Sequence, residues 1–429
     1  MSRYSFFSFD RFEIDKAQNA VRFFYSFDDE LKFTHELNLD LSKVVDPKSI
    51  EAAVFALGMA EIPSYYKNYC PSKIIVRAGK LNDEQVKFWH TLYEKGLGEF
   101  FYKNNIDYRG LINIEIALDA PEINVAVGPL HDVIKMLVPV GGGKDSLVTT
   151  ELLKEKGKEV TWFMLEPLSW IEKLRKVAGV KDYITVERSV EKNFGGFSKL
   201  EGAYNGHVPI TAVYIFSAAL AAQIYGFKYA VLSTERSAEE GNLTYLGSEI
   251  NHQYSKTFEF EKAAHDYIKE YVSPELYIFS LLRNLYEVQI FEKFAKHEKY
   301  FPYFISCNKG LKTGTWCGEC AKCAFVFMGL AAFLPIESVI KILGKNLFDD
   351  SSLAETFKEL IGRGAQKPFD CVGTYEENML LLWMTKQNIE KENKPIPKLF
   401  SEIDVNEGGK YQNLLTASTS DHLIPKDLI

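Results

Sequence analysis

The stretch MLVPVGGGKDS at residues 136–146 decides the fold of this chain. An apolar segment typical of a strand runs into three glycines, and a helical pattern follows from Ser146 to about Lys156. Glycines let the backbone turn sharply and bring N–H groups against phosphate oxygens, and the following helix adds the positive end of its dipole. The order of strand, glycine turn and helix therefore predicts a phosphate-binding loop.

We expect six loop residues to bind the phosphates of a nucleotide: Gly141, Gly142, Gly143, Lys144, Asp145 and Ser146. Lys144 supplies a mobile positive charge, Ser146 supplies a hydroxyl donor, and Asp145 binds Mg²⁺ or caps the helix. A Walker A loop has Ser or Thr after its lysine, where this chain has Asp145, and the third glycine of the dinucleotide fingerprint is absent. A glycine turn that binds no ligand is the alternative.

Strand and helix patterns alternate around this loop, which predicts an open parallel α/β sheet. Continuous apolar runs favour strands covered on both faces, and they occupy residues 160–165 and 229–233, with a long helix predicted at 209–225. The N-terminal region instead predicts an antiparallel meander at 11–14, 21–25 and 31–34, followed by helices at 49–60 and 82–95. The second helix is predicted to begin with a capping box, with Asn82 as the N-cap and Gln85 three residues later.

Three domains follow from these patterns. They are an N-terminal α+β domain at 1–128, an ATP-binding α/β domain at 129–300, and a helical region with a four-cysteine metal site at 301–429. We expect a mostly helical chain after about residue 260 and an irregular tail from Lys391. No catalytic pattern precedes residue 130, so the first domain is expected to be a scaffold or a substrate lid.

Composition narrows the class of protein. The 429 residues are 46% hydrophobic and carry a net charge of -8, with no dense Lys/Arg run, so we expect a globular protein without a nucleic-acid partner. The start of the chain does not resemble a signal peptide, and the longest apolar stretch, 325–335, is too short to span a bilayer. We therefore expect a cytoplasmic protein with no membrane association and no obligate protein partner.

Four of the six cysteines cluster in a short span. Their spacing, Cys-x9-Cys-x2-Cys-x2-Cys, suits a tetrahedral structural Zn²⁺, and an iron–sulfur cluster is the competing interpretation. The ligands would be Cys307, Cys317, Cys320 and Cys323.

Several polar segments are candidates for a site. Glu235 and Arg236 directly follow a predicted buried strand, where ligands of open α/β sheets collect. His207 and His252 lie in polar segments and carry imidazoles that titrate near neutral pH. Cys371 lies outside the cysteine cluster, and its alternative is a small buried apolar residue.

The loop resembles the PP-loop of the ATP pyrophosphatase superfamily, Ser-Gly-Gly-x-Asp-Ser, with Gly141 in place of the first serine. The ordered motifs GGGKDS, NGHVP, STERSAEEGN, NHQYSK, SCN, WCGECAKC and KPFDCVG resemble the UDP-N-acetylmuramoyl-L-alanyl-L-glutamate epimerase family of peptidoglycan synthesis, as far as about Trp383. The resemblance implies a PP-loop fold of the adenine nucleotide alpha hydrolase type.

It also implies an isomerase that uses ATP and Mg²⁺ to invert the terminal L-glutamate of a nucleotide-sugar peptide through a carboxyl adenylate. AMP and diphosphate are released, and the reaction serves cell wall biogenesis and cell shape. Under this resemblance the catalytic candidates are His207, His252, Glu235 and Cys371. Arg236 and Lys256 would join the loop in binding ATP or a substrate carboxylate.

Two other functions share these features. A nucleobase- or tRNA-modifying enzyme of the 7-cyano-7-deazaguanine synthase type has a similar loop and a similar zinc site, although the acidic balance counts against a tRNA substrate. An adenine-nucleotide-binding regulator would bind ATP without cleaving it.

Overall fold

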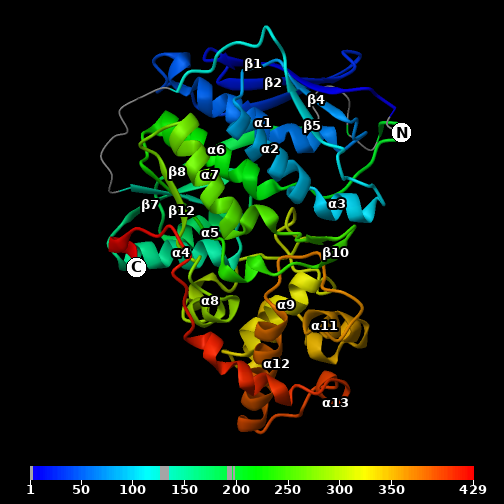
Figure 1. Ribbon diagram of the computed structural model, residues 1–429. Helices are drawn as coiled ribbons and strands as arrows, with labels where there is room; N and C mark the ends of the chain where they lie inside the picture. Colours follow the sequence, from blue (N-terminus) through cyan, green and yellow to red (C-terminus); the bar gives the residue numbers. More distant parts are fainter. Residues whose placement is uncertain (1–2, 126–134, 191–195, 197–198) are drawn as a thin grey trace.

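The computed structural model describes residues 3–125, 135–190, 196 and 199–429. Ten strands within these ranges form one sheet in the order β12-β9-β6-β7-β8-β3-β2-β1-β4-β5 (Figure 1). The predicted domain boundary between residues 128 and 129 lies outside the described residues. The strands of the sheet are β1 Phe7–Asp15, β2 Ala20–Phe27, β3 Leu31–Asn38, β4 Lys73–Val76, β5 Asn113–Ile116, β6 Lys135–Pro139, β7 Glu159–Leu165, β8 Tyr183–Ser189, β9 Tyr229–Leu232 and β12 Tyr277–Ser280.

One half of the sheet is the predicted parallel α/β arrangement. Strands β12, β9, β6, β7 and β8 pair in parallel. Alternate residues of β6 enter different cores, because Leu137 packs with α6 and α7 while Met136 and Val138 pack with α4, α5 and α8. These helices are α4 Lys144–Glu155, α5 Ile171–Ala178, α6 Ile210–Tyr225, α7 Phe258–Tyr271 and α8 Glu287–Phe294. Coverage on both faces explains why the strands read as unbroken apolar runs.

The other half begins with the predicted meander. Strands β1, β2 and β3 pair antiparallel, and β3 continues the sheet by pairing antiparallel with β8. Strands β4 and β5 add a parallel edge beyond β1. The N-terminal strands and the central strands therefore share one sheet rather than forming two.

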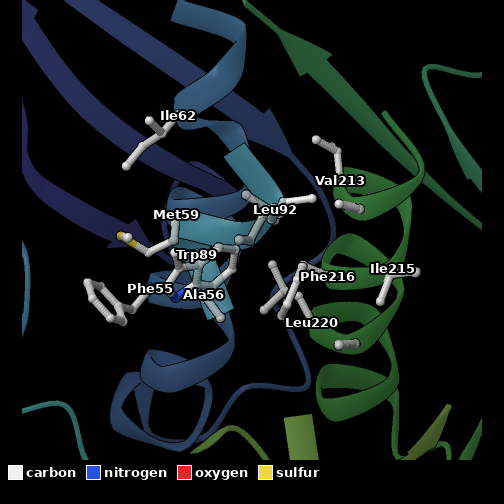
Figure 2. Packing of buried hydrophobic residues seen from close by; sticks show 14 of the residues in the cluster. Phe55, Ala56, Met59, Ile62, Trp89, Leu92, Val213, Ile215, Phe216 and Leu220 are labelled. Atoms are coloured by element: carbon white, nitrogen blue, oxygen red, sulfur yellow. The ribbon is translucent and has the colours of Figure 1, made fainter. Parts of the chain in front are cut away.

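A large core lies beneath the N-terminal strands. Figure 2 shows Trp89 of α2 between Phe55 and Met59 of α1 on one side and Phe216 and Leu220 of α6 on the other. The N-terminal helices are α1 Glu51–Tyr66, α2 Asp83–Gly96 and α3 Gly98–Lys103. The predicted capping box of α2 is confirmed, since Asn82 and Gln85 exchange both hydrogen bonds, each about 3 Å long.

The C-terminal region is helical, as expected, with one exception: β12 forms the edge of the parallel sheet. The helices are α9 Ala321–Ala331, α10 Ile336–Leu343, α11 Ala354–Leu360, α12 Tyr375–Lys391 and α13 Leu399–Glu402. The tail is less irregular than expected, because a 3₁₀ segment at Asn406–Leu415 packs against α12 (Figure 1). A separate hairpin pairs β10 Leu243–Tyr245 with β11 Ser248–Ile250. In the described ranges, no helix combines the length and apolarity that crossing a membrane requires.

Candidate active site

The glycine loop joins β6 to α4 at the carboxyl end of the parallel strands. Gly142 has a φ of +88°, and a Cβ atom built on it would overlap the ring of Trp170. Its carbonyl accepts a hydrogen bond of 3.1 Å from the backbone N–H of Ile305. Ser146 is buried, and its hydroxyl donates to the carbonyl of Gly143 at 3.2 Å, which closes the loop onto the helix.

Gly141 is the loop residue that departs from the PP-loop pattern. It is exposed, and a Cβ atom built on it meets no atom within 4 Å. A serine would therefore fit at this position, so the departure is not forced by crowding.

Three carboxylates gather beside the loop. Asp145, Glu235 and Glu287 offer oxygen atoms that all lie within 4.8 Å of one another. They follow β6, β9 and β12, which are neighbours in the sheet, so the carboxyl ends of three parallel strands bring them together. Burial, reinforced by the charges of Asp145 and Glu235, raises the pKa of Glu287 to about 8. Such oxygen donors are the kind that hard divalent cations prefer.

Lys144 is not the mobile charge that the sequence suggested. Its side chain is 1% exposed, and its ammonium forms ion pairs with Asp145 and Glu287. The ring of Phe291 lies 4.7 Å from the same nitrogen. Burial disfavours the ammonium, but the two carboxylates raise the pKa of Lys144 above its ordinary value. Lys144 thus stabilises two of the three carboxylates, Asp145 and Glu287, by direct ion pairs.

Cys371 and Lys256 form a second group next to the carboxylates. The ammonium of Lys256 lies 3.1 Å from the sulfur of Cys371. Burial disfavours its charge, but Cys371, Glu235 and Asp145 raise the pKa of Lys256. Burial also opposes a thiolate at Cys371, yet Lys256 and a hydrogen bond with His252 lower the pKa of Cys371 to about 6. Lys256 and His252 thus favour the thiolate form of Cys371.

His252 and His207 lie together, with ring centroids 4.5 Å apart, and share the carboxylate of Glu99 from α3. Nδ1 of His252 hydrogen-bonds Glu99, and Nδ1 of His207 lies 3.3 Å from the same oxygen. Burial disfavours the imidazolium, but Cys371 and Glu99 raise the pKa of His252 to about 9. Burial and the charge of His252 lower the pKa of His207 to about 3.

Sequence reasoning missed Glu99 and Glu287. Glu287 follows β12, a four-residue strand whose apolar pattern the sequence did not distinguish from its helical surroundings. Glu99 sits in a short helix among aromatic residues, and nothing local in the sequence connects it to histidines more than 100 positions away. The Nε of Arg236 donates to the hydroxyl of Tyr286 at 3.1 Å, next to Glu287 in the chain.

The four cysteine sulfur atoms lie within 4.8 Å of one another. Two separations are 4.0 Å, between Cys307 and Cys320, and 3.7 Å, between Cys317 and Cys323. A tetrahedral ion with metal–sulfur bonds of about 2.3 Å places sulfur atoms about 3.8 Å apart. Backbone N–H groups of Gly310 and Cys317 also point at the sulfur of Cys307. The cluster therefore fits a metal ion, consistent with structural zinc.

The cysteine loop touches both parts of the site. Ile305, two residues before Cys307, donates to the glycine loop. Lys322, between Cys320 and Cys323, donates through its ammonium to the carbonyl of Cys371. The cysteine loop thus contacts both the glycine loop and the backbone of Cys371.

A partly buried thiol, a histidine with a raised pKa and a carboxylate cluster beside a glycine loop are typical of the active site of an α/β enzyme. A family model described as the MurL N-terminal domain matches residues 1–281, and one described as the MurL C-terminal domain matches residues 303–410. The chain belongs to the MurL family.

Three relatives carry the name UDP-N-acetyl-alpha-D-muramoyl-L-alanyl-L-glutamate epimerase. The protein from Xanthomonas oryzae pv. oryzae is 30% identical over 455 residues, covering 99% of this chain and 96% of the relative. Those from Micromonospora sp. and Salinispora tropica are 32% and 31% identical, covering 92% and 89% of this chain and 90% and 85% of the relatives. The similarity therefore runs through both ends of the sheet and the cysteine cluster.

We expect Cys320→Ser to remove most of the bound metal and to lower the midpoint of thermal unfolding, because the cluster loses one of four ligands. Elemental analysis of the purified protein measures the metal, and calorimetry measures the midpoint. Cys371→Ser is the matched control and should retain the metal. A Cys320→Ser protein with full metal content and an unchanged midpoint would contradict the metal assignment.

We expect Gly142→Ala to reduce the free energy of unfolding by at least about 1–3 kcal/mol, because its positive φ is strained for alanine and the added methyl overlaps Trp170. Gly141→Ala, on open space one residue earlier, should stay within about 0.5 kcal/mol of the parent protein. Urea unfolding measures both. Equal effects at the two positions would show that the loop is not packed as described.

Proposed function

We propose that this protein is an ATP-dependent epimerase that converts the terminal L-glutamate of UDP-N-acetylmuramoyl-L-alanyl-L-glutamate to D-glutamate in peptidoglycan synthesis. The observation that carries the proposal is the contact between Lys256 and Cys371. The charge of Lys256 also interacts with Asp145 of the glycine loop and with Glu235, so a thiolate base would lie next to the carboxylates of the loop region. The names of the three relatives supply the substrate.

The chemistry of the reaction explains why a base must lie close to the group that adenylates the carboxylate. The Cα–H beside a free carboxylate is a very weak acid, since its removal places negative charge next to negative charge. Transfer of AMP from ATP to that carboxylate releases diphosphate and leaves an uncharged acyl group. This group can delocalise the negative charge that forms when the Cα proton is removed. Water then cleaves the adenylate to AMP and the free carboxylate. The base must therefore reach the carbon next to the adenylated group.

The glycine loop would hold the ATP phosphates. Backbone N–H groups at the start of α4 and the open approach at Gly141 suit phosphate oxygens. Asp145, Glu235 and Glu287 would hold Mg²⁺, whose charge, when bound, offsets that of the phosphates. Lys256 would draw the substrate carboxylate towards the α-phosphate and away from bulk water.

Cys371 would remove the Cα proton of the L-glutamyl adenylate. Its thiolate is stabilised by Lys256 and by the hydrogen bond with His252. We assign the return of a proton to His252, which is the imidazolium neighbouring the thiolate. The Cα of the substrate would lie between the sulfur of Cys371 and the ring of His252. His207 is neutral at the same pH and serves instead to pack against His252.

The test is an incubation of the protein with the L-glutamate nucleotide dipeptide, ATP and Mg²⁺ in heavy water. We expect deuterium at the glutamyl Cα, a D-glutamyl product by chiral analysis, and AMP with diphosphate. Cys371→Ser should still release AMP while losing deuterium incorporation about 100-fold or more, because general-base catalysis is worth that much. Cys70→Ser, at a buried thiol remote in sequence from the site, is the matched control.

Two outcomes would contradict the proposed function. One is epimerisation that proceeds without ATP, and the other is AMP release with no exchange at Cα in the parent protein. Turnover of a deazapurine acid in place of the dipeptide would instead favour a nucleobase-modifying enzyme.

The pH dependence follows from the opposed protonation of Cys371 and His252. The active form has the thiol deprotonated and the imidazole protonated, so activity should fall below about pH 6 and above about pH 9. The apparent pKa values of the two limbs of this pH profile belong to the interacting pair of Cys371 and His252 rather than to either residue alone. The measurement is kcat/KM for epimerisation from pH 5 to 10. A profile that keeps rising through pH 10 would contradict the protonated role of His252.

A further inference from the structure

Glu99 is a buried carboxylate that joins the N-terminal part of the chain to the thiol site. It lies in α3 and is 5% exposed. Its carboxylate forms ion pairs with Lys103 and His252, and one of its oxygens lies 3.3 Å from Nδ1 of His207. An ionised carboxylate is costly to bury unless cations and hydrogen-bond donors surround it.

The contacts divide unevenly between the two histidines. Burial opposes ionisation, but hydrogen bonds from His252 and Lys103 lower the pKa of Glu99 to about 2. His252, which makes the shorter contact, carries the positive charge, and His207 stays neutral. With Nδ1 of His252 engaged by Glu99, the second ring nitrogen is the one left to face Cys371.

We propose that Glu99 is a positioning residue of the thiol site: it holds the ring of His252 against Cys371, forming a Glu99–His252–Cys371 relay. The proposal rests on the proposed function for its catalytic meaning, but the relay itself is a property of the free protein. The carboxylate, imidazole and thiol come from segments around residues 99, 252 and 371, so the relay also ties the N-terminal domain to the C-terminal region.

Other charged groups share the neighbourhood and set the size of the expected effect. Lys256 lies against Cys371 and stays in place when Glu99 is changed, so only part of the thiolate stabilisation should disappear. Other titratable groups near the three relay members are Lys103, His207, Lys322 and Asp370, and Lys67 acts on His207.

A bound metal is the competing explanation of the same cluster. The ligand atoms of Glu99, His207 and His252 all lie within 4.8 Å of one another. The direct hydrogen bonds of Glu99 favour the relay, because a carboxylate oxygen and an imidazole nitrogen that share a proton are not both free to bind an ion. Metal analysis separates the two.

The test compares Glu99→Gln, Glu99→Asp and the parent protein in the absence of substrate. The pH dependence of iodoacetamide alkylation at Cys371, followed by mass spectrometry of its peptide, reports thiolate formation directly. In Glu99→Gln the imidazolium loses its counter-charge, so its pKa falls and the pKa of Cys371 rises. We expect the alkylation midpoint to move upward by at least one pH unit from about pH 6.

Activity gives the second readout. Glu99→Gln should lower kcat for epimerisation at pH 7 by about 10-fold or more, with KM for ATP within about 3-fold of the parent value. Glu99→Asp keeps a carboxylate and should recover part of both losses. Glu94→Gln, a partly exposed change in the neighbouring helix α2, is the matched control and should alter neither.

Three results would overturn the relay. They are an unchanged alkylation profile in a folded Glu99→Gln protein, an equal loss in Glu99→Asp and Glu99→Gln, and the loss of one equivalent of metal beyond the cysteine cluster on changing Glu99. A parent protein that neither forms AMP nor exchanges Cα protons would reject the proposed function. The shifted alkylation midpoint would still support the relay in that case.

Discussion

The partly buried ammonium of Lys256 is the charge on which the rest of the site depends. It lies 3.1 Å from the sulfur of Cys371, and its charge also interacts with those of Glu235 and Asp145. A cation that is largely removed from water is stable only when anions surround it, and two carboxylates and a thiol sulfur that come this close would repel one another, when ionised, without it. Cys371 and the carboxylates beside the glycine loop are therefore held together by one side chain.

The cysteine loop gives this arrangement its rigidity. Cys307 stands two residues from Ile305, which bonds the glycine loop, and Lys322 between two further cysteines bonds the carbonyl of Cys371. A metal held by four protein ligands would leave no position for a substrate, so its contribution would be to fix these attachments. In the proposed mechanism, movement of the loop relative to Cys371 by even 1 Å would misplace the Cα–H of the adenylated glutamate relative to its base.

The sequence predicted those features whose cause is local. The apolar run before Gly141, the capping box at Asn82 and the close spacing of the cysteines each depend on a short stretch of sequence, and the structure contains all three. Lys144 was misjudged because its burial depends on Glu287, which only the pairing of β12 with β9 brings near. Glu99 was missed for the same reason, since its partners lie 108 and 153 positions away.

A single carboxylate that faces two imidazoles can balance only one additional positive charge, which is why His252 and His207 differ so widely in protonation. In the proposed mechanism, the order of the pKa values of Cys371 and His252 would also return the site to its starting state. After one proton has moved to Cys371 and another has left His252, both side chains would be neutral. Because the pKa of the thiol lies below that of the imidazole, re-forming their hydrogen bond would move the proton from sulfur to nitrogen. The thiolate and imidazolium would thereby be restored without a separate acid or base.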